Sequence, residues 1–184
     1  METFEIGLPS PLFPFTREDL PDFRYAGYQL RNVFRSIDDA QRRECTELWV
    51  RNGVLSISEA RRRSSQVCYL ISEINTHSII GVNTLYLDQL YEEGQPYWFN
   101  RMFIQHGSRN SRLMITATAA MLCFAKLNLE GEGAPGVLNV NENPKLGRAG
   151  MRRVFSRLGY RWQGRQGERD YWYFDFTRVT INDI

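Results

Sequence analysis

A strand, a polar bend, a long helix and a second strand follow one another between residues 97 and 140, and this succession constrains the fold most. Residues 97–104 have the aromatic content and length of a strand, and residues 105–110 form the bend. Apolar side chains at helical spacing over 111–129 predict an amphipathic helix, and residues 136–140 predict a short buried strand. Two strands joined in this way lie parallel, with a right-handed crossover. The chain is therefore predicted to be an α/β protein.

The rest of the chain predicts further strands and helices around this unit. Ser36 and Asp39 form a capping-box pattern at the start of one helix, which is expected to end at Asn52 and Gly53. The other predicted elements are a strand at 28–34, a basic helix from Glu59, a hairpin of strands 67–74 and 79–87 around the turn 75–78, a last helix through Val154 and Leu158 closed by Gly159, and a strand at 171–176. They predict a mixed α/β layer arrangement without an internal repeat.

With 184 residues, of which 42% are hydrophobic, the chain has room for one domain. Residues 1–27 hold prolines and aromatic residues in alternation, which predicts an extended arm packed on a body formed by residues 28–184. Docking of the arm on a partner is the alternative, and a homo-oligomer stays open. No run approaches the ~18 apolar residues of a membrane span, and the acidic N-terminus is unlike a secretory signal. We therefore expect a cytoplasmic protein without a membrane partner.

The sequence offers few residues that could bind a metal ion or form a disulfide. Cys45, Cys68 and Cys123 show no C-x-x-C spacing, which predicts reduced residues of the core. His77 and His106 stand apart from any cluster of cysteines or carboxylates. We expect no metal cofactor, so the chemistry must come from other groups.

The bend before the long helix is the predicted ligand site. A helix N-terminus presents unpaired N–H groups and a partial positive charge. Arg109 and Arg112 add to that charge. Only two of the chain's 23 basic residues are lysines, so most are arginines, which bind planar anions such as phosphate. The pattern predicts a phosphate cradle, and a solvated helix cap with nearby arginines is the alternative.

The order of these elements, the bend and the segments 139–146 and 155–160 resemble the GNAT family of acyl-CoA-dependent N-acetyltransferases over roughly residues 28–176. The resemblance implies a mixed, mostly antiparallel sheet with flanking helices, splayed between its fourth and fifth strands. In that family the pantetheine arm of acetyl-CoA, or of another acyl-CoA, lies in the splay. The resemblance therefore implies that Phe103 and Ile104 line the pantetheine.

In the same family a loop written Arg/Gln-x-x-Gly-x-Gly/Ala wraps the pyrophosphate. The resemblance assigns this loop here to Ser108, Arg109, Asn110, Ser111, Arg112 and Leu113. Three of these residues depart from the family pattern: Ser108, Ser111 and Leu113. A serine restricts positive φ where the family has glycine, and Arg109 or Arg112 supplies the charge that Ser108 lacks. Asn143 matches the family's asparagine after its fifth strand.

The catalytic groups implied by the resemblance are incomplete. Phe155 stands where the family has a tyrosine acid, and phenylalanine has no proton to give a leaving thiolate. Glu142, near the mouth of the splay, is the predicted general base, and capping of the next helix is its alternative reading. Further candidates for the base are Tyr86, Asp88 and Glu73. An amine held in the right geometry attacks a thioester with help from water alone, so a missing acid does not exclude turnover.

The sequence thus predicts an acyl-CoA-dependent N-acetyltransferase that moves an acetyl group to an unidentified amine of a small molecule or peptide. A non-catalytic binding or regulatory protein of the same fold is an alternative, favoured by Phe155 and the altered loop. An acyl-homoserine-lactone synthase is a further alternative. That family shares the fold in outline and has an arginine near the end of the equivalent strand, as Arg101 is here.

Another alternative is a nucleic-acid-binding accessory protein that uses an arginine-rich C-terminal face. That face would comprise Lys145, Arg148, Arg152, Arg153, Arg157, Arg161, Arg165 and Arg169. Glu168 and Asp170 dilute its charge, which favours a solvated surface, so we expect no nucleic-acid partner. The aromatic residues of 171–176 predict packing in the core and on an edge strand.

Overall fold

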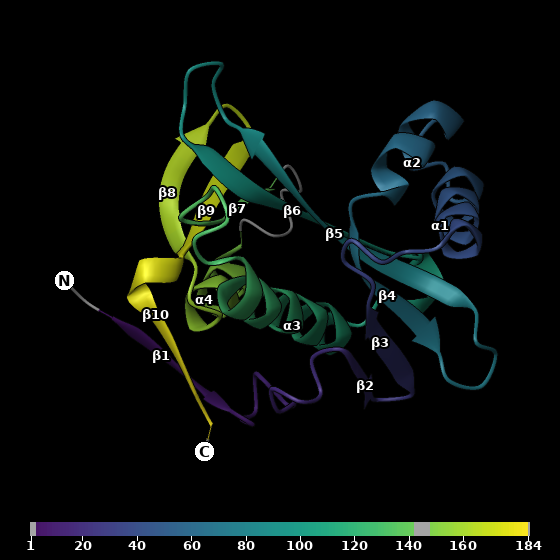
Figure 1. Cartoon of the computed structure of the whole chain (residues 1–184), viewed down its shortest axis with the longest axis horizontal. Coiled ribbons are helices and arrows are strands. Elements are labelled where there is room, and N and C mark those ends of the chain that lie inside the picture. The colour runs from purple at the N-terminus through teal and green to yellow at the C-terminus, as the bar shows by residue number, and fades with distance from the viewer. Residues whose placement is uncertain (1–2, 142–147, 184) are drawn as a thin grey trace. The chain divides into compact units, whose positions relative to one another are not determined.

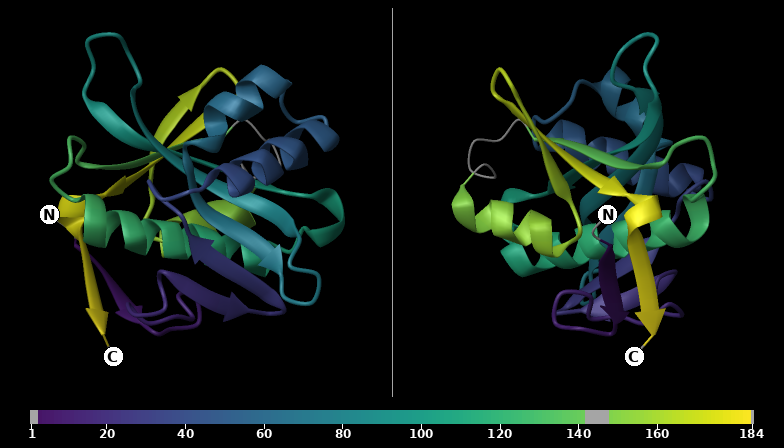
Figure 2. Two further views of the ribbon diagram at one scale, coloured as in Figure 1. Left: turned by 45° about the vertical axis from the view of Figure 1, so that its right-hand side comes forward. Right: turned by 90° about the vertical axis from the view of Figure 1, so that its left-hand side faces the viewer.

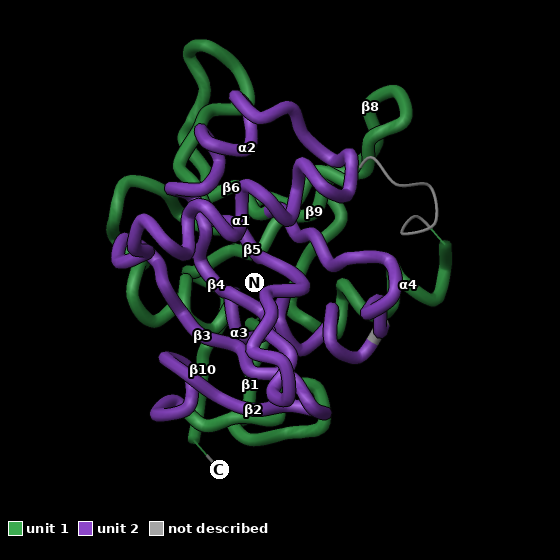
Figure 3. Tube along the Cα trace, turned by 90° about the vertical axis from the view of Figure 1, so that its right-hand side faces the viewer, with its two compact units in different colours: residues 1–16, 86–100, 122–184 green, residues 17–85, 101–121 purple. Residues whose placement is uncertain are grey.

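The computed structural model describes residues 3–141 and 148–183, and Figure 1 shows its helices and strands. The chain divides into two compact units, coloured separately in Figure 3. Unit 1 comprises residues 1–16, 86–100 and 122–184, and unit 2 comprises residues 17–85 and 101–121. Strands β5 (Ile79–Gln89) and β6 (Pro96–Ile104) and helix α3 (Ser111–Leu129) contribute residues to both units.

Unit 2 is built on antiparallel strands. These are β2 (Asp22–Tyr25), β3 (Tyr28–Asn32), β4 (Val67–Glu73) and the first part of β5, which pair in that order. In the register, Leu30 of β3 stands between Phe23 of β2 and Ile71 of β4. The hairpin predicted from 67–74 and 79–87 is confirmed as β4 and β5.

Two helices of unit 2, α1 (Asp39–Arg51) and α2 (Ile57–Ser64), follow β3. Asp38 caps α1: its carboxylate accepts the Gln41 N–H at 2.8 Å, and the Gln41 side chain accepts the Asp38 N–H at 3.1 Å. The capping box predicted at Ser36 is therefore wrong by two residues, because the Ser36 N–H already bonds to the Val33 carbonyl in the preceding turn. The predicted helix end at Asn52 and Gly53 is confirmed.

The core of unit 2 joins these helices to the sheet. Its buried residues come from the segment after β3, from α1 and α2, and from β4 and β5: Val33, Ile37, Cys45, Leu48, Trp49, Ala60, Val67, Leu70, Ile79 and Val82. Phe103, near the end of β6, packs partly buried against this cluster. Burial of each large apolar side chain stabilises the fold by roughly 1.5–3 kcal/mol. The end of β6 is thus anchored in the core of unit 2.

Unit 1 is organised around β7 (Gly136–Asn141). This strand pairs antiparallel with β9 (Arg169–Asp175) along its whole length, and β8 (Arg161–Gln166) pairs with the far side of β9. On its other side β7 pairs in parallel with β6, through Trp98 with Val137 and Phe99 with Leu138. The parallel pairing confirms the strand–helix–strand unit predicted between residues 97 and 140.

The two ends of the chain pair with each other in unit 1. Strand β1 (Phe4–Leu8) runs parallel to β10 (Val179–Asp183), with Ile6 opposite Ile181, and the two strands lie side by side in both views of Figure 2. This pairing was not predicted from the sequence. Residues 1–27 contribute β1 to unit 1 and β2 to unit 2. The division of the chain into an arm and a body stays a prediction.

Helix α4 (Ala149–Arg157) ends as the sequence predicts. Gly159 has a φ of +90°, its N–H bonds to the Ser156 carbonyl, and the next N–H, of Tyr160, bonds to Phe155 at 3.0 Å. A Cβ at Gly159 would lie 3.0 Å from ring atoms of both Phe174 and Phe4, so the position requires glycine for space as well as conformation.

Hydrogen bonding orders the larger sheet as β2-β3-β4-β5-β6-β7-β9-β8, with the β6–β7 pair parallel. The predicted α/β class with a mixed, mostly antiparallel sheet is confirmed. All three cysteines are free and buried, as predicted. One window of α3, Arg112–Leu129, is long and apolar enough to cross a membrane, yet 56% of it is buried inside the structure, and buried core helices show the same property.

Candidate functional site

The loop between β6 and α3 belongs to unit 2 and contains the predicted pyrophosphate residues. A short 3-10 turn, His106–Ser108, follows β6, and α3 begins at Ser111. The Asn110 side chain accepts the Arg112 N–H at 2.9 Å, and its carbonyl accepts the Met114 N–H, so Asn110 acts as the cap of α3. The side-chain oxygen of Asn110 therefore caps the helix.

The two arginines of this loop differ in how they are held. Arg109 is exposed, and its Nε donates to the Ile104 carbonyl at 3.0 Å, which folds the side chain back onto the end of β6. Arg112 is exposed in the first turn of α3. Both guanidinium groups lie at the positively polarised end of a long helix, which is the arrangement that attracts phosphate.

Ser108 lies beneath the loop. Ser108 is 9% exposed. Its hydroxyl accepts a hydrogen bond from Gln105 Nε2 at 3.2 Å and donates one to Glu73 Oε1 at 3.5 Å. The other Glu73 oxygen accepts from Thr76 in the turn after β4. Glu73, one of the candidate bases, is thus engaged by the loop and the turn of unit 2, and it brings a negative charge to the predicted anion site.

Gly81 of β5 sets the position of the strand that leads into the loop. A Cβ at Gly81 would lie 2.9 Å from the Phe103 carbonyl and 3.1 Å from Ile104 Cγ1. The neighbouring Ile80 carbonyl accepts the Gln105 N–H at 2.8 Å. Sequence analysis missed Gly81, although an isolated glycine in a strand signals a close backbone approach.

The predicted pantetheine residues have their side chains in apolar surroundings. Phe103 packs against the unit 2 core, and Ile104 is buried at 7% exposure. Leu113, of the predicted pyrophosphate loop, is fully buried as well. Only the backbone of such residues is suited to a polar ligand. The roles of Phe103, Ile104, Ser108, Arg109, Asn110, Ser111, Arg112 and Leu113 in binding stay predictions.

The junction of β6 and β7 lies in unit 1, where their pairing stops after Phe99 and Leu138. On the next residues, Asn139 Nδ2 donates to Asn100 Oδ1 at 2.8 Å. Asn100 is 5% exposed and its Nδ2 has no partner in the described part of the chain. A buried donor without a partner is costly, so this amide is a ready donor for a carbonyl ligand. Sequence analysis did not identify either asparagine as a site residue.

Phe155, which the resemblance in sequence would place at the position of a tyrosine acid, is a core residue of unit 1. Its ring is 7% exposed, stacks on Trp172 at 5.1 Å and meets Tyr160 edge-on at 5.4 Å. The Tyr160 hydroxyl is buried without a partner among the described residues, and burial raises its pKa. A phenol with a raised pKa is a weaker acid, which disfavours Tyr160 as a proton donor.

Two of the predicted residues, Glu142 and Asn143, lie outside the described residues. Of the other candidate bases, Tyr86 stacks on Phe99 in unit 1 at 5.6 Å, and Asp88 is exposed and accepts the Gln89 N–H. The described residues contain no group of three or more histidines, cysteines or carboxylates that could hold a metal ion.

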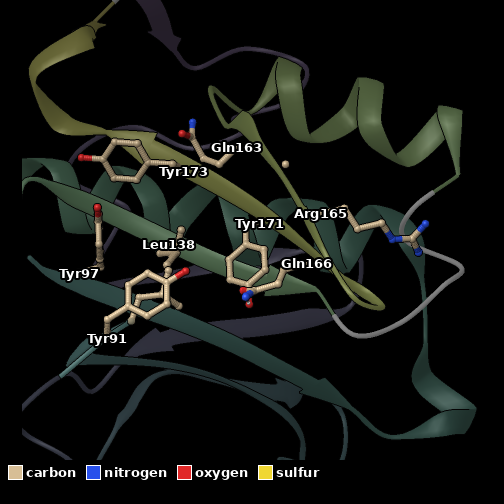
Figure 4. A pocket seen from close by; sticks show the side chains of 10 residues that line it. Tyr91, Tyr97, Leu138, Gln163, Arg165, Gln166, Tyr171 and Tyr173 are labelled. Atoms are coloured by element: carbon tan, nitrogen blue, oxygen red, sulfur yellow. Dashed lines mark hydrogen bonds between the residues drawn. The ribbon is translucent and has the colours of Figure 1, made fainter. Parts of the chain in front are cut away.

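A cavity of about 440 Å³ opens in unit 1, and Figure 4 shows its lining. Four tyrosines line it: Tyr91, Tyr97, Tyr171 and Tyr173, with Leu138 and Gln166 beside them. We call it the tyrosine cavity.

The prediction that residues 171–176 pack in the core and on an edge strand is confirmed in its first part only, because β9 lies between β7 and β8. Trp172, Phe174 and Phe176 are buried in the core as predicted, whereas Tyr171 and Tyr173 line the cavity. Because successive side chains of a strand face opposite ways, the alternation of phenols with apolar rings was a signal of two different faces.

Two described arginines of the proposed nucleic-acid face, Arg152 and Arg165, have partners inside unit 1. Asp170 is 2% exposed, and its carboxylate lies 3.8 Å from Arg152 and 3.9 Å from Arg165. Arg152 also lies over the Trp162 ring at 5.5 Å. These contacts favour an intramolecular role for part of the face.

No protein-family model matches the sequence, and no curated protein matches it. Solved structures do match. A GNAT-family acetyltransferase from Bordetella pertussis superimposes with a TM-score of 0.60 at 12% identity, over 83% of this chain and 96% of that one. The ribosomal-protein-S5-alanine acetyltransferase of Vibrio fischeri matches with a TM-score of 0.55 at 11% identity, over 83% of this chain and 93% of that one.

A ribosomal L7/L12 alpha-N-protein acetyltransferase in complex with coenzyme A matches with a TM-score of 0.52 at 11% identity, over 81% of this chain and 93% of that one. The chain therefore has the fold of the GNAT acetyltransferases, as the resemblance in sequence implied.

Proposed function

We propose that this protein is an acyl-CoA-dependent N-acetyltransferase, which moves an acetyl group from acetyl-CoA to an amine. The observation that carries the proposal is the agreement with the GNAT acetyltransferase fold over 83% of the chain. A neighbour of known structure binds coenzyme A, which supports the choice of co-substrate. A cytoplasmic location and a small-molecule or peptide acceptor belong to the same proposal.

Each unit, taken by itself, contains residues whose chemistry suits a part of such a co-substrate. In unit 2, the exposed Arg109 and Arg112 at the start of α3 offer two cations to an anionic pyrophosphate, and they outnumber the single Glu73 carboxylate. In unit 1, the unpartnered Asn100 Nδ2 offers a buried donor to a carbonyl oxygen.

When bound, acetyl-CoA supplies a thioester that an amine can attack. The net reaction forms a C–N bond, breaks a C–S bond and leaves the amine proton on the thiol sulfur. Glu142 or water takes that proton from the amine, and backbone N–H groups of β6 polarise the carbonyl. The chain otherwise acts by holding the amine in position, since Phe155 has no proton to donate.

A thermal-shift measurement with acetyl-CoA and with coenzyme A tests the proposal, because a ligand that binds only the folded state raises the melting temperature. The double variant Arg109→Ala, Arg112→Ala should lose most of the shift. Arg42→Ala, Arg43→Ala is the matched control, because it removes the same charge from exposed positions of α1. No shift with either ligand in the unmodified protein would refute the proposal.

A non-catalytic protein of the same fold is the second candidate function. The packing of Phe155 between Trp172 and Tyr160 favours it, because this position offers no acid. Consumption of acetyl-CoA in the presence of a panel of amines decides between the two. Binding of coenzyme A without amine-dependent consumption would favour the non-catalytic protein.

A further inference from the structure

Four of the ten residues that line the tyrosine cavity are tyrosines, and Gln163, Gln166 and Arg165 are its polar members. Tyr97 and Tyr173 meet edge to face, with ring centroids 5.5 Å apart and planes at 83°. The Tyr171 hydroxyl donates to Gln166 Oε1 at 3.4 Å, and Tyr91 comes from the loop that follows β5. In Figure 4 these rings surround Leu138, which forms an apolar floor. Rings arranged in this way offer both edges and faces to another aromatic ring.

The charges of the lining restrict the ligand further. None of the described residues that line the cavity is an aspartate or glutamate. The one charged residue, Arg165, points away from the tyrosines in Figure 4, and its Nε lies 3.9 Å from Asp170. Burial raises the pKa of Tyr173, so its hydroxyl is neutral at ordinary pH. A polyamine, with several ammonium groups, would find no carboxylate among the described residues of the lining.

The cavity lies beside the junction of β6 and β7. Leu138 belongs to the last pair of that junction, with Phe99, and Tyr97 precedes Phe99 by two residues on β6 and therefore faces the same side of the sheet. A ligand in contact with Leu138 would therefore lie next to the end of the parallel pairing. The volume of about 440 Å³ lies within the usual range of small-molecule sites, ~300–1,000 Å³.

We infer that the tyrosine cavity binds the acceptor of the reaction, and that this acceptor carries an aromatic ring close to a primary amine. That the ligand is an acceptor amine rests on the proposed function. That it carries an aromatic ring rests on the cavity alone. Two sources supply this chemistry: a small arylalkylamine, and a peptide whose first residue is aromatic. The described lining offers no carboxylate for the several ammonium groups of a polyamine, so we expect polyamines to bind more weakly.

Calorimetric titration of the full chain tests the inference with three probes, each in the presence and absence of coenzyme A. The probes are 2-phenylethylamine, a tripeptide that begins with phenylalanine, and spermidine. One or both aromatic probes should bind at least about tenfold more tightly than spermidine. The relative affinity of the two aromatic probes identifies the source. Tighter binding of spermidine, or no binding of either aromatic probe, would overturn the inference.

Variants locate the binding. Tyr171→Ala should weaken binding of the aromatic probe about tenfold, and Tyr91→Ala, at a 63% exposed position where folding is not at risk, should weaken it severalfold. Tyr25→Ala, in β2, removes a half-buried tyrosine elsewhere and should leave binding unchanged. Equal affinity in all three variants would place the aromatic probe outside the cavity.

The same titrations separate this inference from the proposed function. Binding of coenzyme A without binding of an aromatic amine would overturn the inference and leave the acetyltransferase proposal standing. Binding of the aromatic amine without any thermal shift by coenzyme A would refute the acetyltransferase proposal. The cavity would then be an aromatic-amine site that serves another purpose.

Discussion

Asn139 donates its side-chain amide to Asn100 at 2.8 Å, directly after the last backbone pair between β6 and β7. The bond joins the two strands through side chains where their backbones no longer pair. Asn100 is 5% exposed, and its Oδ1 accepts this bond while its Nδ2 has no partner in the described chain. The junction is therefore held by one buried bond and retains one unused buried donor.

We predict that Asn139→Leu destabilises the protein by about 1–3 kcal/mol, because it leaves the Asn100 oxygen buried without a donor. Urea unfolding measures the free energy. Asn128→Leu is the control, since its amide is exposed and bonds only to a carbonyl of its own helix, and its effect should stay within about 0.5 kcal/mol. Equal losses in both variants would show that the buried bond has no special contribution.

Gly81→Ala should destabilise the protein by about 1–3 kcal/mol, because the new Cβ would lie 2.9 Å from the Phe103 backbone carbonyl and either strand would have to move. Arg109 is anchored on the carbonyl of the next residue, Ile104, so the thermal shift given by coenzyme A should shrink as well. Gly107→Ala is the matched control in the same loop, since nothing lies within 4 Å of its Cβ.

Local patterns in the sequence were sufficient for much of the fold. The predicted helix at 111–129 matches α3 residue for residue, because apolar side chains recur at helical spacing and polar segments bound it. Gly159 was predicted to close α4 because glycine takes positive φ readily. The pairing of β1 with β10 could not be predicted in this way, since it joins the two ends of the chain.

In the candidate site, too, the features that lie within one short segment could be predicted, and those that join distant segments could not. Arg109 and Arg112 were predicted from one short segment, and they lie exposed at the start of a helix as expected. Ser108 and Glu73 are 35 residues apart in the sequence, and Asn100 and Asn139, whose side chains share a hydrogen bond, are 39 apart. The tyrosine cavity also brings together separate segments, which include Tyr91, Leu138 and Tyr171. No local pattern specifies which distant residues meet, so these features became visible only in the folded chain.

Tyr160→Phe should leave the stability unchanged or raise it by about 1 kcal/mol, because the hydroxyl that it removes is buried without a partner in the described structure. Tyr69→Phe makes the same chemical change at a buried tyrosine whose hydroxyl bonds to the Leu20 carbonyl at 2.7 Å. That variant should lose about 1–2 kcal/mol. Thermal or urea unfolding of the two variants side by side measures the contrast, and a loss for Tyr160→Phe as large as for Tyr69→Phe would reveal an unseen partner.

The buried thiols predict a loss of stability at alkaline pH. Burial, and secondarily the Glu44 carboxylate, raise the pKa of Cys45 from about 9 to about 12, and burial raises the pKa of Cys68 as well. Between these values the folded state keeps its thiol protons while the unfolded chain releases them. The thiol contribution to the free energy of unfolding is therefore complete below pH ~9 and falls as the pH rises towards ~12, by at most about 1.4 kcal/mol per pH unit for each thiol.

Comparison with Cys45→Ala isolates this effect from the titration of tyrosines and lysines, which both proteins share. We expect the free energy of unfolding to fall less steeply between pH 9 and 11 in the variant than in the unmodified protein. Native protein at pH 8 should also resist a thiol reagent such as dithionitrobenzoate, whereas all three cysteines should react in denaturant. Parallel pH profiles of the two proteins, or rapid reaction of Cys45 in the native state, would show that this thiol is open to solvent.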